Sequence, residues 1–139
     1  MTAMKNSPEI TVRITEENDI VEVRKAIRDA IVKTGFGITD VTRIVTAASE
    51  LARNIYRYAG SGYMELYQLN SDGNICIELA FIDKGPGIED VEKAMEQGYT
   101  TGGGLGMGLP GAKRLMDEME IQSGPGQGTT VTVKKFLKR

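Results

Sequence analysis

The sequence from residue 39 to residue 58 reads TDVTRIVTAASELARNIYRY. Its apolar residues recur at helical spacing along one stripe, which predicts an amphipathic helix packed on a sheet. Thr39 or Asp40 is expected to cap the helix, and Ala59-Gly60 follows its end. No other segment of the chain carries so strong a helical pattern. The stripe consists of Val41, Ile44, Val45, Ala48, Ala52 and Ile55.

The segments around this helix predict the remaining layers. Alternating apolar residues indicate a strand at 10–14, and apolar residues at helical spacing indicate a helix over 19–33, ended by Gly35 and Gly37. This order of elements predicts one α+β domain over residues 1–139, a two-layer α/β sandwich whose mixed, mostly antiparallel sheet is covered by helices on one face. The other expected elements are strands at 63–69, 75–83, 120–122 and around Val131 and Val133, a hairpin connection at 70–74, and helices at 89–97 and 110–118.

Composition excludes several classes of function. The chain has 139 residues, 26% of them charged, with a net charge of −2 and its Lys and Arg residues scattered. A nucleic-acid-binding protein would normally carry a basic stripe, so nucleic acid is not an expected partner. Residues 1–9 have no apolar core of the kind a signal peptide needs, and no run is long enough to span a bilayer. The expected location is therefore the cytoplasm, with no membrane partner.

Two residue types narrow the chemistry further. Cys76 is the only cysteine, which excludes an intramolecular disulfide and a cysteine-rich zinc site. Histidine is absent, which excludes a Ser-His-Asp triad, a histidine-ligated metal and the His-Arg-Asp catalytic loop of eukaryotic-type kinases.

The polar face of the 39–58 helix carries a candidate pair of functional residues. Glu50 and Asn54 are four residues apart and therefore share one face, one helical turn apart. At about 100° per residue, Glu50 points away from the apolar stripe. A solvated surface glutamate, paired with Arg53 or Arg57 on the same face, is the plainer interpretation and stays open.

The strand at 75–83 ends in a second candidate. Asp83 shares the parity of Ile75, Ile77, Leu79 and Phe81, which predicts a carboxylate at the end of a buried row. Burial of a carboxylate is costly unless it has a hydrogen-bonding partner. The turn Lys84-Gly-Pro-Gly87 follows at once. Asp83 either opens this tight turn or accepts a hydrogen bond from the amine of a bound ligand.

A glycine-rich stretch, TTGGGLGMG at residues 100–108, precedes the helix expected from Pro110. Glycine runs before a helix N-terminus expose backbone N–H groups that can hold phosphate. Residues 106–111 fit the pattern G-x-G-x-x-G, but no strand precedes them, so a dinucleotide-binding Rossmann unit is rejected. A Walker A loop is absent as well.

Four motifs in order resemble a known superfamily. Glu50-Leu-Ala-Arg-Asn54, Asp83-Lys-Gly-Pro-Gly87, Gly104-Leu-Gly-Met-Gly108 and Gly126-Gln-Gly128-Thr-Thr130 resemble the N, G1, G2 and G3 boxes of the GHKL ATPases and kinases. The resemblance covers nearly the whole chain and implies the Bergerat-type ATP-binding fold. Within this superfamily the chain looks like the bacterial anti-sigma-factor kinase branch, and residues 108–118 are similar to the RsbT-type switch kinases of the stressosome.

The resemblance also implies roles for single residues. Glu50 would be the general base, and Asn54 would give an amide oxygen to Mg²⁺, a cation that prefers oxygen ligands. Asp83 would accept from the adenine amino group. Arg53, Lys84, Lys113 and Arg114 are unranked candidates for the cation at the γ-phosphate. The remaining expected ATP-binding residues are Gly85, Gly87, Thr101, Gly104, Leu105, Gly106, Met107, Gly108, Thr129 and Thr130.

The function implied is an ATP-dependent protein serine/threonine kinase. Its partners would be STAS-domain proteins of the stressosome scaffold and antagonist type, phosphorylated in a partner switch of the stress response, and then a PP2C-type phosphatase regulator. The alternative function is a nucleotide-dependent binding module that sequesters a sigma factor or other regulator. The sequence also leaves open whether the chain forms a homodimer. ATP hydrolysis of the gyrase, Hsp90 or MutL type is a third option, but it is not expected, because those enzymes couple ATP to further domains that 139 residues cannot hold. A histidine-kinase role would need a histidine in another chain.

Overall fold

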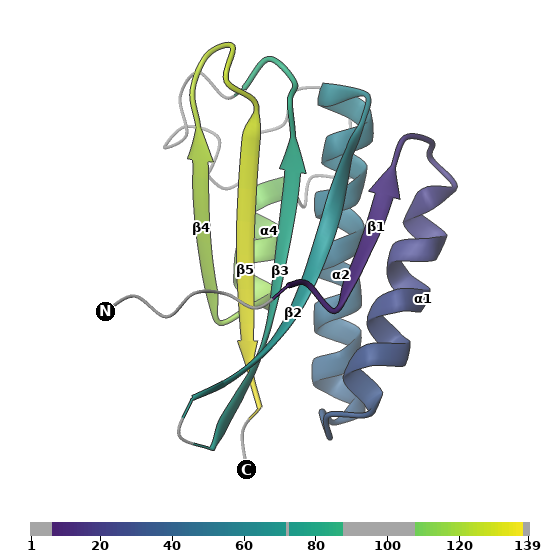
Figure 1. The fold of residues 1–139 in the computed structure, drawn as a ribbon, viewed down its shortest axis with the longest axis vertical. Coiled ribbons are helices and arrows are strands. Elements are labelled where there is room, and N and C mark those ends of the chain that lie inside the picture. Colours follow the sequence, from purple (N-terminus) through teal and green to yellow (C-terminus); the bar gives the residue numbers. More distant parts are fainter. Residues whose placement is uncertain (1–6, 72, 88–107, 138–139) are drawn as a thin grey trace.

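The computed structural model describes residues 7–71, 73–87 and 108–137. Figure 1 shows one sheet in front of a layer of helices. The elements in chain order are β1 Ile10–Ile14, α1 Asp19–Val32, α2 Ile38–Asn54, the π-helix η1 Ile55–Ala59, β2 Gly62–Ser71, β3 Asn74–Asp83, α4 Gly108–Leu115, β4 Glu118–Ser123 and β5 Thr129–Phe136.

The five strands form a single sheet in the order β1-β2-β3-β5-β4. Each pairing in the described part of the chain is antiparallel. The expected two-layer α+β fold is confirmed, and the parallel component that a mixed sheet allows for does not occur among these strands. Strand β3 lies at the centre, so its terminal residue Asp83 is flanked by β2 on one side and β5 on the other.

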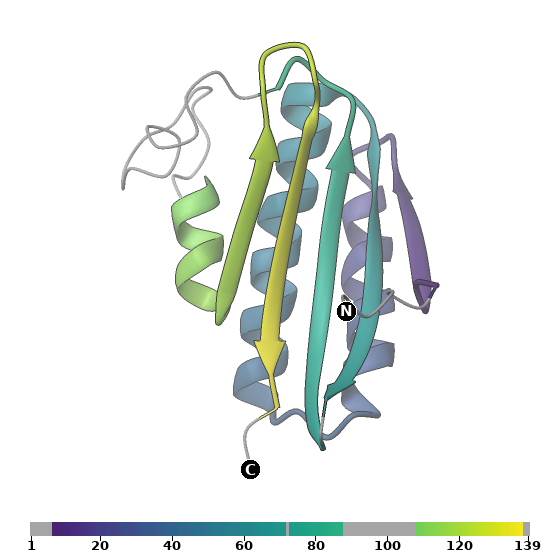
Figure 2. The same ribbon diagram turned by 60° about the vertical axis from the view of Figure 1, so that its left-hand side comes forward.

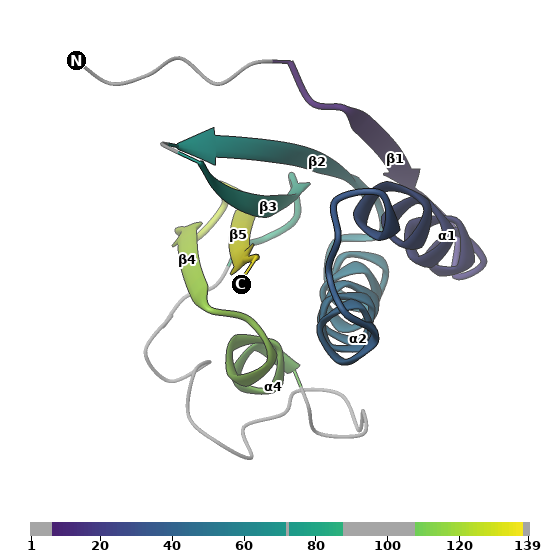
Figure 3. The same cartoon turned by 90° about the horizontal axis from the view of Figure 1, so that it is seen from below.

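The helices cover one face of the sheet, as the view from below shows (Figure 3). Alternate residues of β3 (Ile77, Leu79 and Phe81) are buried in the core, as their common parity predicts. Helix α2 lies between α1 and α4 and packs against both (Figure 3). Its buried residues extend beyond the expected stripe because neighbours contact it on several sides. They are Ile44, Val45, Ala47, Ala48, Ser49, Leu51 and Ala52.

The ends of α2 differ from the prediction. The helix begins at Ile38 with Gly37 as its N-cap, and no side chain caps it. Thr39 and Asp40 are therefore wrong as caps, because both lie within the first turn. Asp40 instead forms an ion pair with Arg43 at 3.2 Å. At the other end the α-helix stops at Asn54 and continues as η1.

A π-helical turn, η1, ends the helical segment that leads to β2. The sequence predicted one continuous helix over residues 39–58. In the structure, Ile55–Ala59, the five residues before Gly60, have the wider geometry of a π-helix. Gly60 ends the segment with φ +81° and bonds back to Ile55. Single π turns inside or at the end of α-helices are frequent at functional sites. This one follows Asn54 directly.

The remaining differences concern element ends. Helix α1 ends at Val32, one residue early, while β2 and β4 are longer than expected at both ends. Helix α4 spans Gly108–Leu115 in place of 110–118, because Glu118 already pairs with Lys134 in the sheet. The helix expected at 89–97 lies outside the described residues.

A buried lysine joins three elements at the lower end of the fold. Lys135 is only 5% exposed, because it lies on the face of β5 that the helices cover. Its ammonium donates to the carbonyl of Leu115 at 2.9 Å, which caps the C-terminus of α4. The same nitrogen lies 3.6 Å from Asp117 and 3.8 Å from Asp40. Lys135 thus links β5, α4 and the first turn of α2.

Replacing this lysine tests whether the link stabilises the fold. In Lys135→Met, the Leu115 carbonyl loses its side-chain donor, and Asp40 and Asp117 each lose an ion-pair partner. We expect the free energy of unfolding to fall by about 1–3 kcal/mol, the usual cost of an unsatisfied buried polar group. Urea denaturation provides the measurement. Lys113→Met, at an exposed position of α4, is the control and should stay within about 0.5 kcal/mol. Equal stability of the two variants would contradict a stabilising role for Lys135.

Candidate functional site

The predicted site residues gather at one end of the molecule. The C-terminal ends of α2 and β3 and the beginning of β5 lie at the top in Figure 1. Glu50 and Asn54 come from α2, Asp83 from β3 and Thr129 from β5. The same end of the sheet is seen from another side in Figure 2, where the β4–β5 hairpin curves over it.

Glycine 62 shows how closely α2 and β3 approach each other there. A Cβ atom on Gly62 would lie 2.8 Å from Ile55 Cγ2 and 3.1 Å from Asp83 Cβ, and it would collide with the Ile82 carbonyl. Ile55 follows Asn54 directly. The end of α2 and the end of β3 therefore meet on either side of one glycine, which brings the first two sequence motifs together.

Glu50 is not a freely solvated surface residue. Its side chain is 18% exposed, and Arg53 Nη1 donates to its Oε1 at 2.8 Å. Arg53 itself is 27% exposed. Of the two arginines expected near Glu50, Arg53 is the partner, whereas Arg57 is exposed on η1. A carboxylate held in this way has a fixed orientation, which general-base chemistry requires.

Asp83 has the partners that its position requires. Its Oδ1 accepts from the backbone N–H of Gly85 at 2.9 Å and of Thr129 at 3.2 Å. The first bond closes the turn after β3, and the second ties that turn to β5. Asp83 therefore does open the tight turn. Because both bonds engage Oδ1, Oδ2 is the oxygen suited to accept from a ligand amine.

Three glycines allow the turn after β3 to pack closely against its neighbours. A Cβ on Gly85 would lie 2.6 Å from Ala59 Cβ, so the turn rests on η1. Gly87 has φ +81° and Gly128 has φ +74°. Side chains there would collide with the carbonyls of Gly124 and Asp83 respectively. Backbone atoms thus form the wall next to Asp83, a surface that a planar base can approach.

Ser123 is a residue of the site that sequence reasoning missed. Its hydroxyl donates to the Gly128 carbonyl at 3.0 Å and lies 2.8 Å from the Thr129 hydroxyl. Ser123 pairs with Thr129 across the β4–β5 hairpin. The signal that could have found it is the register of that hairpin, which motif spacing does not contain.

The prediction placed Thr129 or Thr130 on the adenine side and counted both among the ATP-binding residues. Thr129 pairs with Asp83 and shares the parity of the core residues Val131 and Val133. Thr130 pairs with Ile82 and therefore faces the opposite side of the sheet. The structure brings Thr129 to the site and leaves Thr130 outside it.

The expected phosphate-binding segment belongs to the described residues only where α4 begins. Gly108 is the first residue of α4 and has φ +48°. Thr101, Gly104, Leu105, Gly106 and Met107 lie outside the described residues. Of the candidate cations, Lys84 is exposed, and Lys113 and Arg114 occupy the last turn of α4, away from Gly108. Arg53 is the candidate in contact with another site residue.

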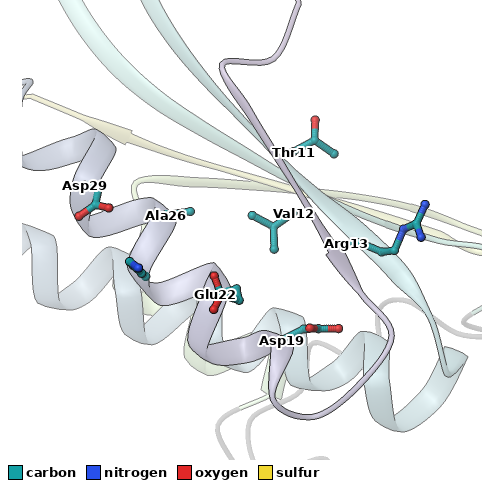
Figure 4. Close-up of a pocket in the computed structure, with 8 residues that line it drawn as sticks. Thr11, Val12, Arg13, Asp19, Glu22, Ala26 and Asp29 are labelled. Atoms are coloured by element: carbon teal, nitrogen blue, oxygen red, sulfur yellow. The ribbon is translucent and has the colours of Figure 1, made fainter.

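Two other features do not belong to this site. A hollow of about 450 Å³ between β1 and α1 is lined by charged side chains of both signs, including Arg13, Glu22 and Asp29 (Figure 4). It shares no residue with the predicted site. Cys76 is buried, and its burial raises the pKa of the thiol to about 11. That thiol stays protonated at neutral pH and is unsuited to nucleophilic chemistry.

Residues 14–135 match the family of histidine kinase-like ATPase domains, and the chain belongs to this family of nucleotide-binding proteins. Over 127 residues it is 49% identical to the serine/threonine-protein kinase RsbT of Bacillus subtilis, which covers 91% of this chain and 96% of that protein. An anti-sigma F factor of Caldanaerobacter subterraneus is 40% identical over 108 residues, 73% of this chain and 74% of that protein. The chain is thus a protein kinase of the serine/threonine type, in the anti-sigma-factor regulator branch of the family.

Solved structures confirm the fold. The RsbU and RsbW domains of a Mycobacterium tuberculosis protein align with a TM-score of 0.63 at 24% identity, over 95% of this chain and 34% of that chain. The histidine kinase domain of a blue-light activated kinase from Erythrobacter litoralis aligns with a TM-score of 0.56 over 99% of this chain and 66% of that chain. In the described residues, no helix has both the length and the apolar character that crossing a membrane requires.

Two glycines of the β4–β5 hairpin form a matched test of the site wall. Gly126 and Gly128 have nearly equal φ values of +75° and +74°, but a Cβ on Gly126 would meet nothing within 4 Å. Gly126→Ala should cost about 1 kcal/mol of stability through left-handed strain alone. Gly128→Ala should cost about 1–3 kcal/mol more through its collision with the Asp83 carbonyl. Thermal or urea denaturation measures both, and equal losses would contradict the close packing.

Proposed function

We propose that this chain transfers the γ-phosphate of Mg·ATP to serine or threonine residues of STAS-domain partners, as a cytoplasmic switch kinase of the stressosome type in the stress response. Having phosphorylated them, it engages a PP2C-type phosphatase regulator. The observation that carries the proposal is the meeting of α2 and β3 at Gly62, which gathers Glu50, Asn54 and Asp83 at one end of the fold. The identity with RsbT supports the partner class by analogy.

Adenine recognition falls to the ends of β3 and β5. Asp83, already oriented by the backbone N–H groups of Gly85 and Thr129, accepts from the exocyclic amine of the base. A fixed acceptor discriminates adenine from guanine, which presents a carbonyl at the corresponding position. The Thr129 hydroxyl, positioned by Ser123, adds a polar contact beside it. The backbone wall at Gly87 and Gly128 lets the ring approach closely.

Magnesium fits the donor atoms at the end of α2. The amide oxygen of Asn54 is a neutral ligand of the kind Mg²⁺ accepts alongside phosphate oxygens and water. Asn54 is half-buried at the last α-helical position, and the next residue, Ile55, lies close to Gly62, as Asp83 does. When bound, the ion would supply charge neutralisation on the phosphates. Backbone N–H groups at Gly108 stand at a helix N-terminus, where phosphate is favoured.

Glu50 acts as the base in the transfer step. The partner's hydroxyl oxygen attacks the γ-phosphorus, its proton passes to the Glu50 carboxylate, and the bond from phosphorus to the β-phosphate oxygen breaks. The products are a phosphoserine or phosphothreonine and ADP. No covalent enzyme intermediate is required, so the rate arises from positioning and electrostatics. Arg53 holds Oε1 of Glu50, which leaves Oε2 to accept the proton.

A second function has its own support. The chain is 40% identical to an anti-sigma F factor over 73% of its length. In that alternative, the nucleotide sets a conformation that sequesters a sigma factor, and phosphate transfer is secondary. The two functions differ in whether a phosphorylated partner leaves the complex.

A transfer assay with Glu50→Gln separates these functions. With labelled ATP, Mg²⁺ and a STAS-domain protein, the unchanged chain should label the partner on serine or threonine. Glu50→Gln should lower the transfer rate by about 100-fold or more, since general-base catalysis contributes on that scale. Its ATP affinity should remain, because the amide keeps the shape of the side chain. Tight partner binding without any labelled product would favour the sequestering module.

Asp83→Asn tests the adenine contact. The amide keeps the size of the side chain but places an N–H₂ group or a weaker acceptor opposite the ligand amine. We expect ATP affinity to fall by about 1–3 kcal/mol, the cost of losing a partly buried hydrogen bond to a charged group. Calorimetric titration with ATP and with GTP measures the effect, and the preference for ATP should decrease. Unchanged ATP affinity would remove Asp83 from the site.

A further inference from the structure

We propose that Arg53 is the cation that binds the γ-phosphate of ATP, and that it does so while holding Glu50, so that one guanidinium joins the base to the group being transferred. The inference rests on the proposed kinase function and assigns a residue that the sequence motifs left open among four candidates. It follows from the ion pair between Arg53 Nη1 and Glu50 Oε1 at 2.8 Å.

The position of Arg53 on α2 is the first reason. In the proposed reaction, the γ-phosphate must reach both the metal at Asn54 and the hydroxyl that Glu50 activates. Residues i, i+3 and i+4 of a helix are neighbours on its surface. Glu50, Arg53 and Asn54 have this spacing on the last turns of α2. A phosphate that serves both Glu50 and Asn54 therefore lies next to Arg53.

Burial and donor geometry are the second reason. The Arg53 side chain is 27% exposed and that of Glu50 is 18% exposed, so the pair is partly shielded from water. Guanidinium carries five N–H donors in a planar fork, and the bond to Glu50 uses one of them. The fork can bind a carboxylate along one edge and a phosphate along another, which an ammonium group does less well. Arg53 thus has the shape for two anions at once.

The other three candidates from the sequence, and Arg57, fit this role less well. Residues 98–107 contain no lysine or arginine, so the glycine-rich segment supplies only backbone and hydroxyl donors. Lys113 and Arg114 are exposed in the last turn of α4, whose N-terminus is at Gly108. Lys84 is exposed and lies beyond Asp83, on the adenine side of the site. Arg57 is exposed on η1, past Asn54.

A purely structural role makes a different prediction. Arg53 is a basic residue in the last turn of α2, where a positive charge stabilises the helix end and neutralises a nearby glutamate. In that case its loss would lower stability, or would weaken all nucleotides alike. A γ-phosphate cation instead contributes to ATP binding and not to ADP binding. The difference between the two affinities is therefore the decisive quantity.

The experiment uses the full chain with Arg53→Ala, Arg53→Lys and the control Arg43→Ala. Arg43 also forms an i,i+3 pair on α2, with Asp40 at 3.2 Å, but at the opposite end of the helix. Calorimetric titration with Mg·ADP and with a non-hydrolysable Mg·ATP analogue gives both affinities, and thermal denaturation shows that each variant is folded. Single-turnover transfer to a STAS-domain protein gives the rate.

We expect Arg53→Ala to weaken the ATP analogue by about 10- to 100-fold, the scale of a hydrogen bond to a charged group, and ADP by less than about 2-fold. Arg53→Lys should recover part of the loss, because it keeps the charge but not the fork. Arg43→Ala should match the unchanged chain in both affinities. The transfer rate should follow the ATP-analogue affinity across the series.

Two results would overturn the inference. Equal weakening of ADP and the ATP analogue would assign Arg53 a structural role, and full retention of both affinities and of the transfer rate would remove it from the site. Either result leaves the kinase function intact if Asp83→Asn still weakens both nucleotides. Absence of nucleotide binding in the unchanged chain would instead reject the proposed function, and with it the role of Arg53.

Discussion

The packing of β2 across the junction between α2 and β3 constrains the whole site. Gly62 pairs with Asp83 of β3 on one side and with Ile14 of β1 on the other. Ile55 occupies the space where a side chain on Gly62 would lie. Any larger residue there would separate the helix end from the strand end. Because interiors are close-packed, such a separation would move whole elements and not a single side chain. The distance between the end of α2 and the end of β3, the proposed metal-binding and adenine-binding parts, is thus fixed by the core of the fold.

The charged groups in this frame are stabilised by neighbours that also orient them. Asp83 bonds to two backbone N–H groups from different segments, so it cannot rotate without loosening the turn after β3 or the start of β5. Glu50 is held by Arg53 in a partly shielded position. The hydrogen bonds that tie these carboxylates to their neighbours also fix where their oxygens lie. Packing and preorganisation therefore have a common origin here.

Sequence alone predicted the elements that local periodicity determines and failed where long-range pairing decides. The stripe on α2, the buried parity of β3 and the turn at Asp83 all follow from spacing within a few residues. Thr129 and Thr130 stayed alternatives because the side of the sheet that each one faces depends on the register between β3 and β5. Ser123 and Lys135 were missed for the same reason, since each acts on residues of another element. The caps expected at Thr39 and Asp40 failed because Gly37 begins the helix without a side-chain bond.

Histidine kinase catalytic domains have this architecture but transfer phosphate to a different acceptor, so the fold alone cannot determine the chemistry. In this chain the proposed transfer chemistry lies at the end of α2. A helix presents residues three and four apart as one surface, and here that surface offers a carboxylate, a guanidinium and an amide within a single turn. Helical geometry sets the spacing of these three side chains. The packing of η1 against the turn at Gly85 sets their distance from the backbone wall next to Asp83, the proposed adenine contact. If Glu50 is the general base, as proposed, it is attached to a helix and not to a loop, so the partner must bring its hydroxyl to that point. Under this proposal the partner's surface selects the acceptor residue, and the kinase holds ATP and the general base in register.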